Sequence, residues 1–256
     1  MIDADPKPAT PETSNHEEAD LMEIHGPNAD TLAADLAESV ADSLRRAVAK
    51  RGAASLAVSG GSTPLPFFRH LRRHKLPWNQ VSVTLADERW VDTDHEDSNE
   101  ALVRRELLVE EASGARFVPL KNDAPTPEKG EDACEKALAG LSWPLDVLIL
   151  GMGGDGHTAS LFPKVLKHSH AVRMGLDLDT PAAKRCIAMH PAEAPHPRLS
   201  LTLKALLDCR RLILHITGEG KKKVYEKALA GGPVDDLPIR AILRQTRRPV
   251  EVHWAP

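Results

Sequence analysis

A short apolar segment that runs into a glycine-rich loop restricts the fold of this chain more than any other feature. Residues 146–163 are D-V-L-I-L-G-M-G-G-D-G-H-T-A-S-L-F-P. The apolar run that ends at Leu150 is typical of a buried strand in a parallel sheet. Four glycines within the next six residues permit backbone conformations that a side chain would forbid. Open α/β sheets bind their ligands at the carboxyl ends of such strands, so the loop is predicted to carry a site.

The glycine loop closes on two titratable residues, Asp155 and His157. An imidazole can exchange protons near neutral pH, which makes His157 the leading candidate for a catalytic residue. We also expect the segment from Thr158 to Ser160 to begin a short helix that Pro163 ends.

The same loop has the spacing G-x-G-x-x-G of a dinucleotide-binding turn, and Asp177 lies about where a ribose-binding acid would stand. That fingerprint requires a full crossover helix after its third glycine, whereas Pro163 interrupts the segment within a few residues. We therefore expect no dinucleotide site. Neither G-x-x-x-x-G-K-[ST] nor G-x-S-x-G occurs, which argues against a P-loop nucleotide hydrolase and a serine hydrolase.

Three further predicted strands, residues 55–59, 81–86 and 212–217, also end in polar segments. The first leads into S-G-G-S-T-P, residues 59–64, ahead of a predicted helix that includes Leu71. Backbone N–H groups and a helix N-terminus there would form a cradle for an anion such as phosphate. A capped turn without a ligand explains the same residues equally well, because Ser and Thr are common N-caps.

The other two polar segments are Asp87-Glu88-Arg89 and Gly218-Glu219-Gly220-Lys221. Charged residues directly after a buried strand are expected in a loop at the carboxyl rim of the sheet, although a solvated charge cluster is as good an explanation. Lys221 falls in the first turn of a predicted helix, where the helix dipole disfavours a cation. That position indicates either a bound anion or an ordinary exposed lysine.

Strands that alternate with helices along the chain, without an internal repeat, predict a three-layer Rossmann-like α/β fold. Its sheet should be mostly parallel, with helices on both faces, and its right-handed crossovers should gather the four polar loops at one edge. One long amphipathic helix is predicted over residues 28–51, ending at Gly52. The acidic, proline-rich residues 1–20 are expected to be a flexible tail, and residues 21–256 a single domain.

The composition, 41% hydrophobic and 27% charged with a formal net charge of −4, argues against nucleic-acid and membrane partners. No apolar run is long enough to span a bilayer, and the acidic start does not resemble a secretory signal. Three widely spaced cysteines are expected to be reduced thiols of a cytoplasmic protein. His168, His170 and His196 match no metal-binding spacing, so solvated loop histidines are favoured and no metal site is expected.

Four segments taken together resemble the 6-phosphogluconolactonases of the glucosamine-6-phosphate isomerase/6-phosphogluconolactonase family. They are S-G-G-S-T-P (59–64), D-E-R-W-V with H-x-x-S-N (87–99), G-M-G-G-D-G-H-T-A-S-L-F-P (151–163) and T-G-x-x-K (217–221). The resemblance extends from about Asn28 to the end of the chain. Small departures occur at Asp92, Lys164 and Ser200, where the family commonly has proline, glycine and threonine.

The wider deaminase/isomerase-like superfamily also contains glucosamine-6-phosphate deaminases, which share the S-G-G-S-T-P cradle. Deaminases typically continue the histidine loop as I-A-F-N-E-P, whereas this chain has T-A-S-L-F-P and carries Arg89 after its acidic pair. Both differences resemble the lactonases.

The resemblance implies hydrolysis of 6-phospho-D-glucono-1,5-lactone to 6-phospho-D-gluconate, the second step of the oxidative pentose phosphate pathway, without a metal or cofactor. His157 would be the base that deprotonates water, Asp155 would orient it, and Arg89 would contact the oxyanion or the sugar. The 6-phosphate would be held by five residues, Gly61, Ser62, Thr63, Arg198 and Lys221. The remaining site loops would comprise Asp87, Glu88, Gly153, Gly154 and Gly156.

The implied partner is a small sugar-phosphate lactone, and a monomer is favoured. Two other functions remain open. A deaminase or aldose–ketose isomerase would use the same phosphate grip with Asp87 as the likelier base. A non-catalytic sugar-phosphate sensor would keep Ser62, Thr63 and Lys221 but would not need His157.

Overall fold

The computed structural model describes residues 20–163, 184–192 and 194–256. The predicted tail up to residue 19, the departure at Lys164, the discarded ribose contact Asp177, and the loop histidines His168 and His170 lie outside the described residues.

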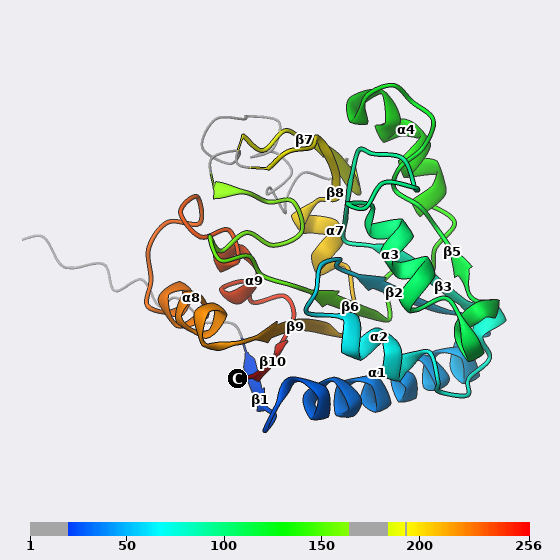
Figure 1. Cartoon of the computed structure of the whole chain (residues 1–256), viewed down its shortest axis with the longest axis horizontal. Coiled ribbons are helices and arrows are strands. Elements are labelled where there is room, and N and C mark those ends of the chain that lie inside the picture. The colour runs from blue at the N-terminus through cyan, green and yellow to red at the C-terminus, as the bar shows by residue number, and fades with distance from the viewer. Residues whose placement is uncertain (1–19, 164–183, 193) are drawn as a thin grey trace, which may run out of the picture.

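A seven-stranded sheet with every neighbouring pair parallel forms the centre of the molecule (Figure 1). In spatial order its strands are β1 (Leu21–His25), β10 (Val250–Ala255), β9 (Leu212–Thr217), β6 (Val147–Leu150), β2 (Ala54–Val58), β3 (Val81–Leu85) and β5 (Arg116–Phe117). The predicted parallel sheet is confirmed. The edge strand β1 was not predicted, because its residues are half-buried or exposed without a regular alternation and gain a partner only when β10 lies beside them.

A second, antiparallel sheet contains β4 (Asp87–Arg89), β8 (Arg198–Leu201) and β7 (Cys186–Met189) in that order. The prediction that Asp87-Glu88-Arg89 forms a loop was therefore wrong. These three residues are extended because they pair with β8, which is more than 100 residues away in sequence. The charged segment nevertheless follows β3 directly and stays at the carboxyl edge of the main sheet.

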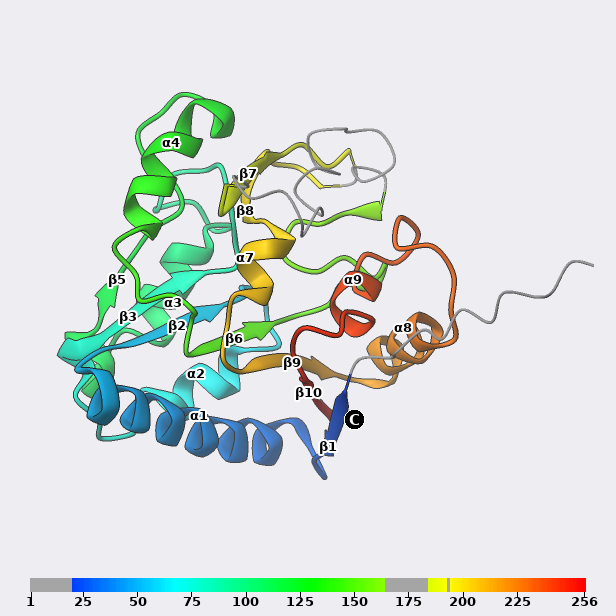
Figure 2. The same ribbon diagram turned by 180° about the vertical axis from the view of Figure 1, so that it is seen from behind.

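Helices cover both faces of the main sheet. Figures 1 and 2 show α1 (Ala29–Arg51) and α2 (Leu65–Leu71) on one face, with α7 (Leu203–Leu207), α9 (Arg240–Leu243) and the second sheet on the other. In the part of the chain that the structure describes, the remaining helices are α3 (Asn99–Glu106), α4 (Pro127–Leu138) and α8 (Glu219–Leu229), together with 3-10 turns at Trp78–Gln80 and Glu110–Gly114. Among the described residues, no helix has both the length and the apolarity needed to cross a bilayer.

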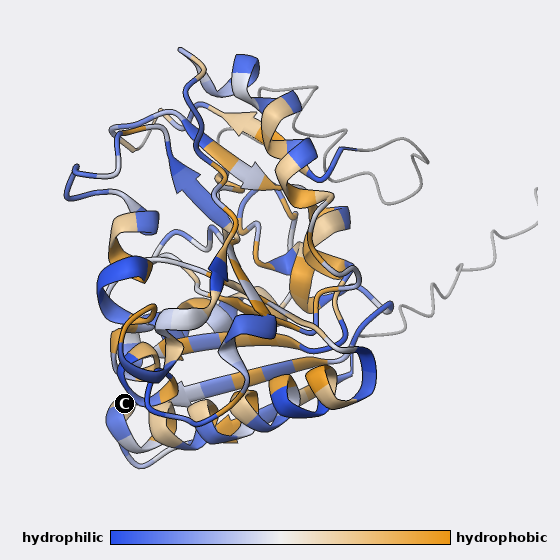
Figure 3. Ribbon diagram, turned by 90° about the vertical axis from the view of Figure 1, so that its right-hand side faces the viewer, coloured by the Kyte–Doolittle hydropathy of each residue, from blue (hydrophilic) through white to orange (hydrophobic). Residues whose placement is uncertain are grey.

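Helix α1 has the ends that its sequence predicts. The side chain of Asn28 accepts a hydrogen bond from the Thr31 N–H at 2.8 Å, and Gly52 ends the helix with a φ of +75°. Its apolar stripe, which includes Leu36 and Leu44, is fully buried. Figure 3 shows hydrophobic residues concentrated between the layers and hydrophilic residues on the outer turns and loops.

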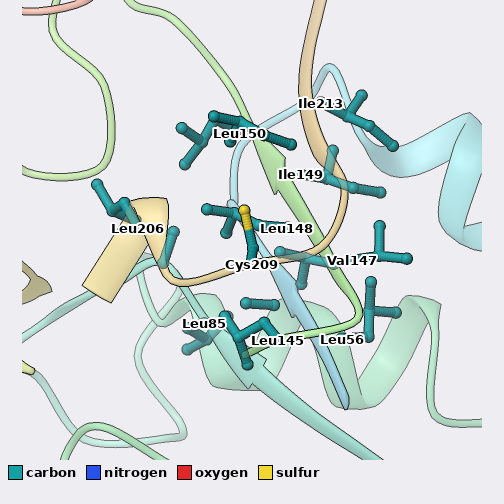
Figure 4. Packing of buried hydrophobic residues seen from close by; sticks show 14 of the residues in the cluster. Leu56, Leu85, Leu145, Val147, Leu148, Ile149, Leu150, Leu206, Cys209 and Ile213 are labelled. Carbon is teal, nitrogen blue, oxygen red and sulfur yellow. The ribbon is translucent and has the colours of Figure 1, made fainter. Parts of the chain in front are cut away.

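Strand β6 lies at the middle of the core and carries the glycine loop at its carboxyl end. All four of its residues are buried, and Figure 4 shows them packed among Leu56 of β2, Ile213 of β9 and Leu206 of α7. At its amino end, the buried Asp146 carboxylate accepts the Ser55 N–H at 2.9 Å and pairs with Arg51. A strand fixed on both faces and at its start gives the loop a rigid base.

The short helix expected at Thr158 to Ser160 does not form. The segment makes a turn instead, in which the Leu161 N–H donates to the Thr158 carbonyl at 2.9 Å. Ala159 has a φ of +46°, which is incompatible with a right-handed helix. The Thr158 hydroxyl also donates to the Gly151 carbonyl at 2.8 Å and folds the chain back on the loop. Pro163 is itself helical, so it does not end a helix as predicted, although residues 157–162 form no helix directly after the third glycine.

Candidate active site

The carboxyl ends of four adjacent strands, β9, β6, β2 and β3, surround a cavity of about 260 Å³. All four predicted polar segments contribute to its wall, as expected for the carboxyl edge of a parallel sheet. Nine of the predicted site residues line it: Gly61, Ser62, Thr63, Asp87, Arg89, Gly153, His157, Arg198 and Lys221. Asp155, Gly154, Gly156 and Glu88 are not part of the lining.

His157 and Asp155 form a hydrogen-bonded pair at the tip of the glycine loop. The Nδ1 atom of His157 lies 2.6 Å from Oδ1 of Asp155, and the same oxygen accepts the His157 N–H at 3.1 Å. Partial burial opposes ionisation of Asp155, but the hydrogen bond from His157 and its charge hold the pKa of the carboxyl below its usual value. An ionised Asp155 is only an acceptor, so Nδ1 carries a proton, and in the neutral imidazole Nε2 is the nitrogen with the free lone pair.

The imidazole is also held from its face. The ring of Phe162 stacks on His157 with 4.3 Å between centroids, and the Arg198 guanidinium lies over the same phenyl ring at 5.2 Å. Thus the turn that replaces the expected helix brings Phe162 back to support His157. An imidazole fixed by both a hydrogen bond and a stacked ring has little freedom to leave its position.

Two glycines of the loop are required by the local geometry. A Cβ on Gly153 would lie 2.2 Å from His157 Nδ1 and 2.7 Å from Asp155 Oδ1, so a side chain there would collide with the pair. Gly156 has a φ of +77°, and a Cβ on it would lie 2.5 Å from Leu237. By contrast, a Cβ on Gly154 would meet nothing within 4 Å. The loop therefore needs glycine at 153 and 156 but tolerates a side chain at 154.

The predicted phosphate grip is brought together on another wall of the cavity. The Lys221 ammonium donates to the Thr63 hydroxyl at 3.2 Å, which links the start of α8 to the turn after β2. Gly61 has a φ of +90°, which glycine adopts without strain. Burial lowers the pKa of Lys221 from its ordinary value. A half-buried cation whose nearest partner is a neutral hydroxyl is suited to an anionic ligand.

Asp87 and Arg198 form a second buried polar group in the wall. The Asp87 carboxylate accepts a hydrogen bond from the Ser160 hydroxyl at 2.5 Å and lies 3.5 Å from the Arg198 guanidinium. Burial lowers the pKa of Arg198, and the charge of Asp87 opposes that effect. Nε of Arg198 has no partner among the described residues, so the guanidinium retains hydrogen-bonding capacity.

Arg89 reaches the cavity from β4. Its Nη1 atom donates to the carbonyl oxygen of Asp97 at 2.6 Å, while its Nε has no partner among the residues that the structure describes. The side chain is therefore anchored through Nη1, while its buried Nε is left without a partner among the described residues.

Glu88, between Asp87 and Arg89, faces away from the cavity and caps helix α3. Its carboxyl group accepts the backbone N–H of Asn99 and of Glu100, at 2.8 and 2.7 Å. Burial raises the pKa of Glu88 to about 7, although these N–H donors act in the opposite direction. Glu88, one of the predicted site residues, therefore lies behind the cavity wall and does not line the cavity.

Two lining residues, Asn99 and His215, had no role in the sequence prediction. The amide of Asn99 donates to the Asp87 carbonyl at 2.9 Å, and a Cβ on Gly60 would lie 1.9 Å from its Oδ1. His215 is 2% exposed with neither ring nitrogen bonded within the described structure, and burial lowers its pKa to about 4. The signals available were the H-x-x-S-N motif and a histidine inside an otherwise apolar strand.

Comparisons with known proteins identify the relatives of this chain. A family model described as glucosamine-6-phosphate isomerases/6-phosphogluconolactonase matches residues 27–254. A 6-phosphogluconolactonase of Rhizobium meliloti (strain 1021) is 46% identical over 229 residues, which cover 90% of this chain and 96% of the relative. One from Pseudomonas putida is 43% identical and covers 90% of both chains.

Solved structures extend the similarity. The crystal structure of a 6-phosphogluconolactonase from Shewanella baltica OS155 has a TM-score of 0.85 and 43% identity, covering 94% of this chain and 99% of its own. A monomeric glucosamine-6-phosphate deaminase, with a TM-score of 0.70 and 19% identity, shares the fold.

Substitution of the two neighbouring glycines tests the geometry of the loop. In Gly153→Ala the new methyl group must displace the imidazole, so the His157–Asp155 hydrogen bond should break. In the matched control Gly154→Ala it should persist. Imidazole ¹⁵N chemical shifts distinguish the Nδ1–H tautomer from other states, and only Gly153→Ala should lose it at His157. Identical His157 shifts in the two variants would contradict the arrangement.

The buried carboxyl of Glu88 predicts a pH-dependent stability. Its pKa of about 7 in the folded state exceeds the ordinary value of 4.5, so the folded protein retains a proton that the unfolded chain releases. The free energy of unfolding should therefore fall as pH rises from 4.5 to 7. The contribution is on the order of 3 kcal/mol. In urea titrations, the difference in free energy of unfolding between wild type and Glu88→Gln should change by this amount between pH 4.5 and 7. A difference that stays constant with pH would exclude the raised pKa of Glu88.

Proposed function

The chain belongs to the glucosamine-6-phosphate isomerase/6-phosphogluconolactonase family, and we propose that it hydrolyses 6-phospho-D-glucono-1,5-lactone to 6-phospho-D-gluconate with His157 as the general base. The activity is that of a 6-phosphogluconolactonase, a carboxylic ester hydrolase of the oxidative pentose phosphate pathway. The hydrogen bond that fixes Nδ1 of His157 on Asp155 is the observation that supports the choice of base most strongly.

The substrate is anchored by its phosphate. Lys221 supplies a positive charge, and Ser62 and Thr63 supply hydroxyl groups beside it. Arg198 adds a second cation that lines the same cavity. Fixing the phosphate on this wall presents the lactone ring to the wall that carries His157, which converts the attack of water into a reaction within one bound complex.

Hydrolysis then needs one base and one group of oxyanion donors. Nε2 of His157 removes a proton from a water molecule as the water oxygen bonds to C1 of the lactone. The carbonyl oxygen becomes an oxyanion, which Arg89 and backbone N–H groups of the glycine loop stabilise. When the C1–O5 bond breaks, the imidazolium returns its proton to O5, and one molecule of water has been added. Asp155 stabilises the imidazolium while it exists.

The proposed catalytic domain is a single unit over residues 21–256. It works as a monomer, without nucleic-acid or membrane partners. A cytoplasmic location belongs to the same proposal. Its support is that Cys134, Cys186 and Cys209 are all buried and free of disulfides, as expected in a reducing compartment.

The role of His157 can be tested by substitution. In His157→Gln, kcat for freshly prepared lactone, corrected for spontaneous opening, should fall by about 10²–10⁴-fold. KM should change little because the phosphate grip is intact. His190→Gln is a matched control, since His190 also pairs with a carboxylate, Glu128, but does not line the cavity. Equal turnover in both variants would remove His157 as the base.

Assays with both the lactone and glucosamine 6-phosphate separate the alternative functions. A deaminase would release ammonia from glucosamine 6-phosphate and would depend on Asp87, whereas a sensor would bind sugar phosphates without turnover. The proposal requires lactone hydrolysis above the spontaneous rate and no ammonia release.

A further inference from the structure

A group of potential metal ligands lies just outside the catalytic cavity. It consists of His95 and Asp97, in the segment between β4 and α3, and His196, which precedes β8. Figures 1 and 2 show that this segment lies beside β8. The spacing of the histidines gave no metal motif, but the fold brings the three side chains together from positions 99 residues apart. None of them lines the catalytic cavity.

The distances suit a small divalent ion. One ligand atom from each residue lies within 4.8 Å of the others. Oδ2 of Asp97 stands 2.9 Å from Nε2 of His196 and 3.9 Å from Nδ1 of His95. Ligands at about 2 Å from a tetrahedral zinc ion are separated by about 3.3 Å, and the two measured distances lie on either side of that value. Only small movements are needed for an ion to enter.

Two hydrogen bonds already join the three residues. Nδ1 of His95 accepts the backbone N–H of Asp97 at 3.0 Å, and Nε2 of His196 lies 2.9 Å from Oδ2 of Asp97. The same nitrogen and oxygen atoms are the ones that a metal would bind, so an ion that enters the site replaces both hydrogen bonds.

The surrounding charge also favours a cation. Residues 92–97, D-T-D-H-E-D, contain four carboxylates and no Lys or Arg. Lys121 lies 3.7 Å from Asp92, Arg89 donates to the Asp97 carbonyl, and Arg198 is close enough to interact with the charge of Asp97, so three positive charges offset part of this field. Two imidazoles with one carboxylate form the nitrogen-rich set that zinc and its neighbours prefer over magnesium or calcium.

We propose that His95, Asp97 and His196 bind a divalent cation of the zinc type and thereby tie the β4–α3 segment to the start of β8. A water molecule completes the coordination. Because the Asp97 carbonyl is the acceptor for Arg89, the ion also steadies the backbone on which that arginine is anchored. The site is separate from the reacting centre and does not depend on the proposed function.

Zinc titration of the full-length, chelator-treated protein against a chromophoric competitor tests the site. The chain holds twelve histidines, so stoichiometry alone does not identify the ligands. His95→Gln and His196→Gln should each weaken the tightest site at least tenfold, whereas His190→Gln, which alters an exposed histidine–carboxylate pair elsewhere, should not. Zinc should raise the thermal unfolding midpoint of wild type and His190→Gln only.

Circular dichroism of the metal-free proteins shows whether each variant is folded, and the two single substitutions provide independent tests. Cobalt(II) added in place of zinc should give the visible absorption of a tetrahedral ion in wild type and lose it in both variants. Equal zinc affinity in wild type and both folded variants, or no binding by wild type at micromolar zinc, would overturn the proposal.

Discussion

In the proposed mechanism, the chemistry depends on the hydrogen bond between Asp155 and Nδ1 of His157. It determines which imidazole nitrogen carries the proton and therefore which one can accept a proton from water. The surrounding structure preserves this contact. Glycine at 153 leaves room for the ring, Phe162 stacks on its face, and the buried strand β6 supports the loop from below.

In the proposed function, the cavity separates substrate binding from reaction. Lys221 and Thr63 form a cationic wall at the start of α8, whereas His157 lies on the loop after β6. Four neighbouring strands of a parallel sheet place these groups at one edge, and the sheet holds them at a fixed separation. Substrate binding through a remote phosphate can then be used to orient the lactone carbonyl, which requires a rigid frame between the two walls.

Much of this arrangement could be predicted because it rests on local patterns. The four-residue repeat of α1, the apolar runs of β2, β6 and β9, and the gathering of their carboxyl ends all follow from the sequence. The elements that were missed or misassigned depend on distant partners. Strand β1 needs β10, and β4 needs β8. The turn at Ala159 depends on tertiary contacts, which helix propensities do not take into account.

The side-chain clusters were harder to predict than the strands. Glu88 and Asp87 are adjacent in sequence, yet one caps α3 and the other lines the cavity, because successive residues of a strand point to opposite sides. His95, Asp97 and His196 meet only through the pairing of β4 with β8, so spacing alone could not reveal them.

The most direct test of the account is the kinetics of Asp155→Asn. An asparagine cannot hold the Nδ1–H tautomer as a carboxylate does, so kcat for the lactone should fall by about 10²–10⁴-fold while KM stays within a few-fold of wild type. A kcat close to that of wild type would show that orientation of His157 by Asp155 is not the basis of catalysis.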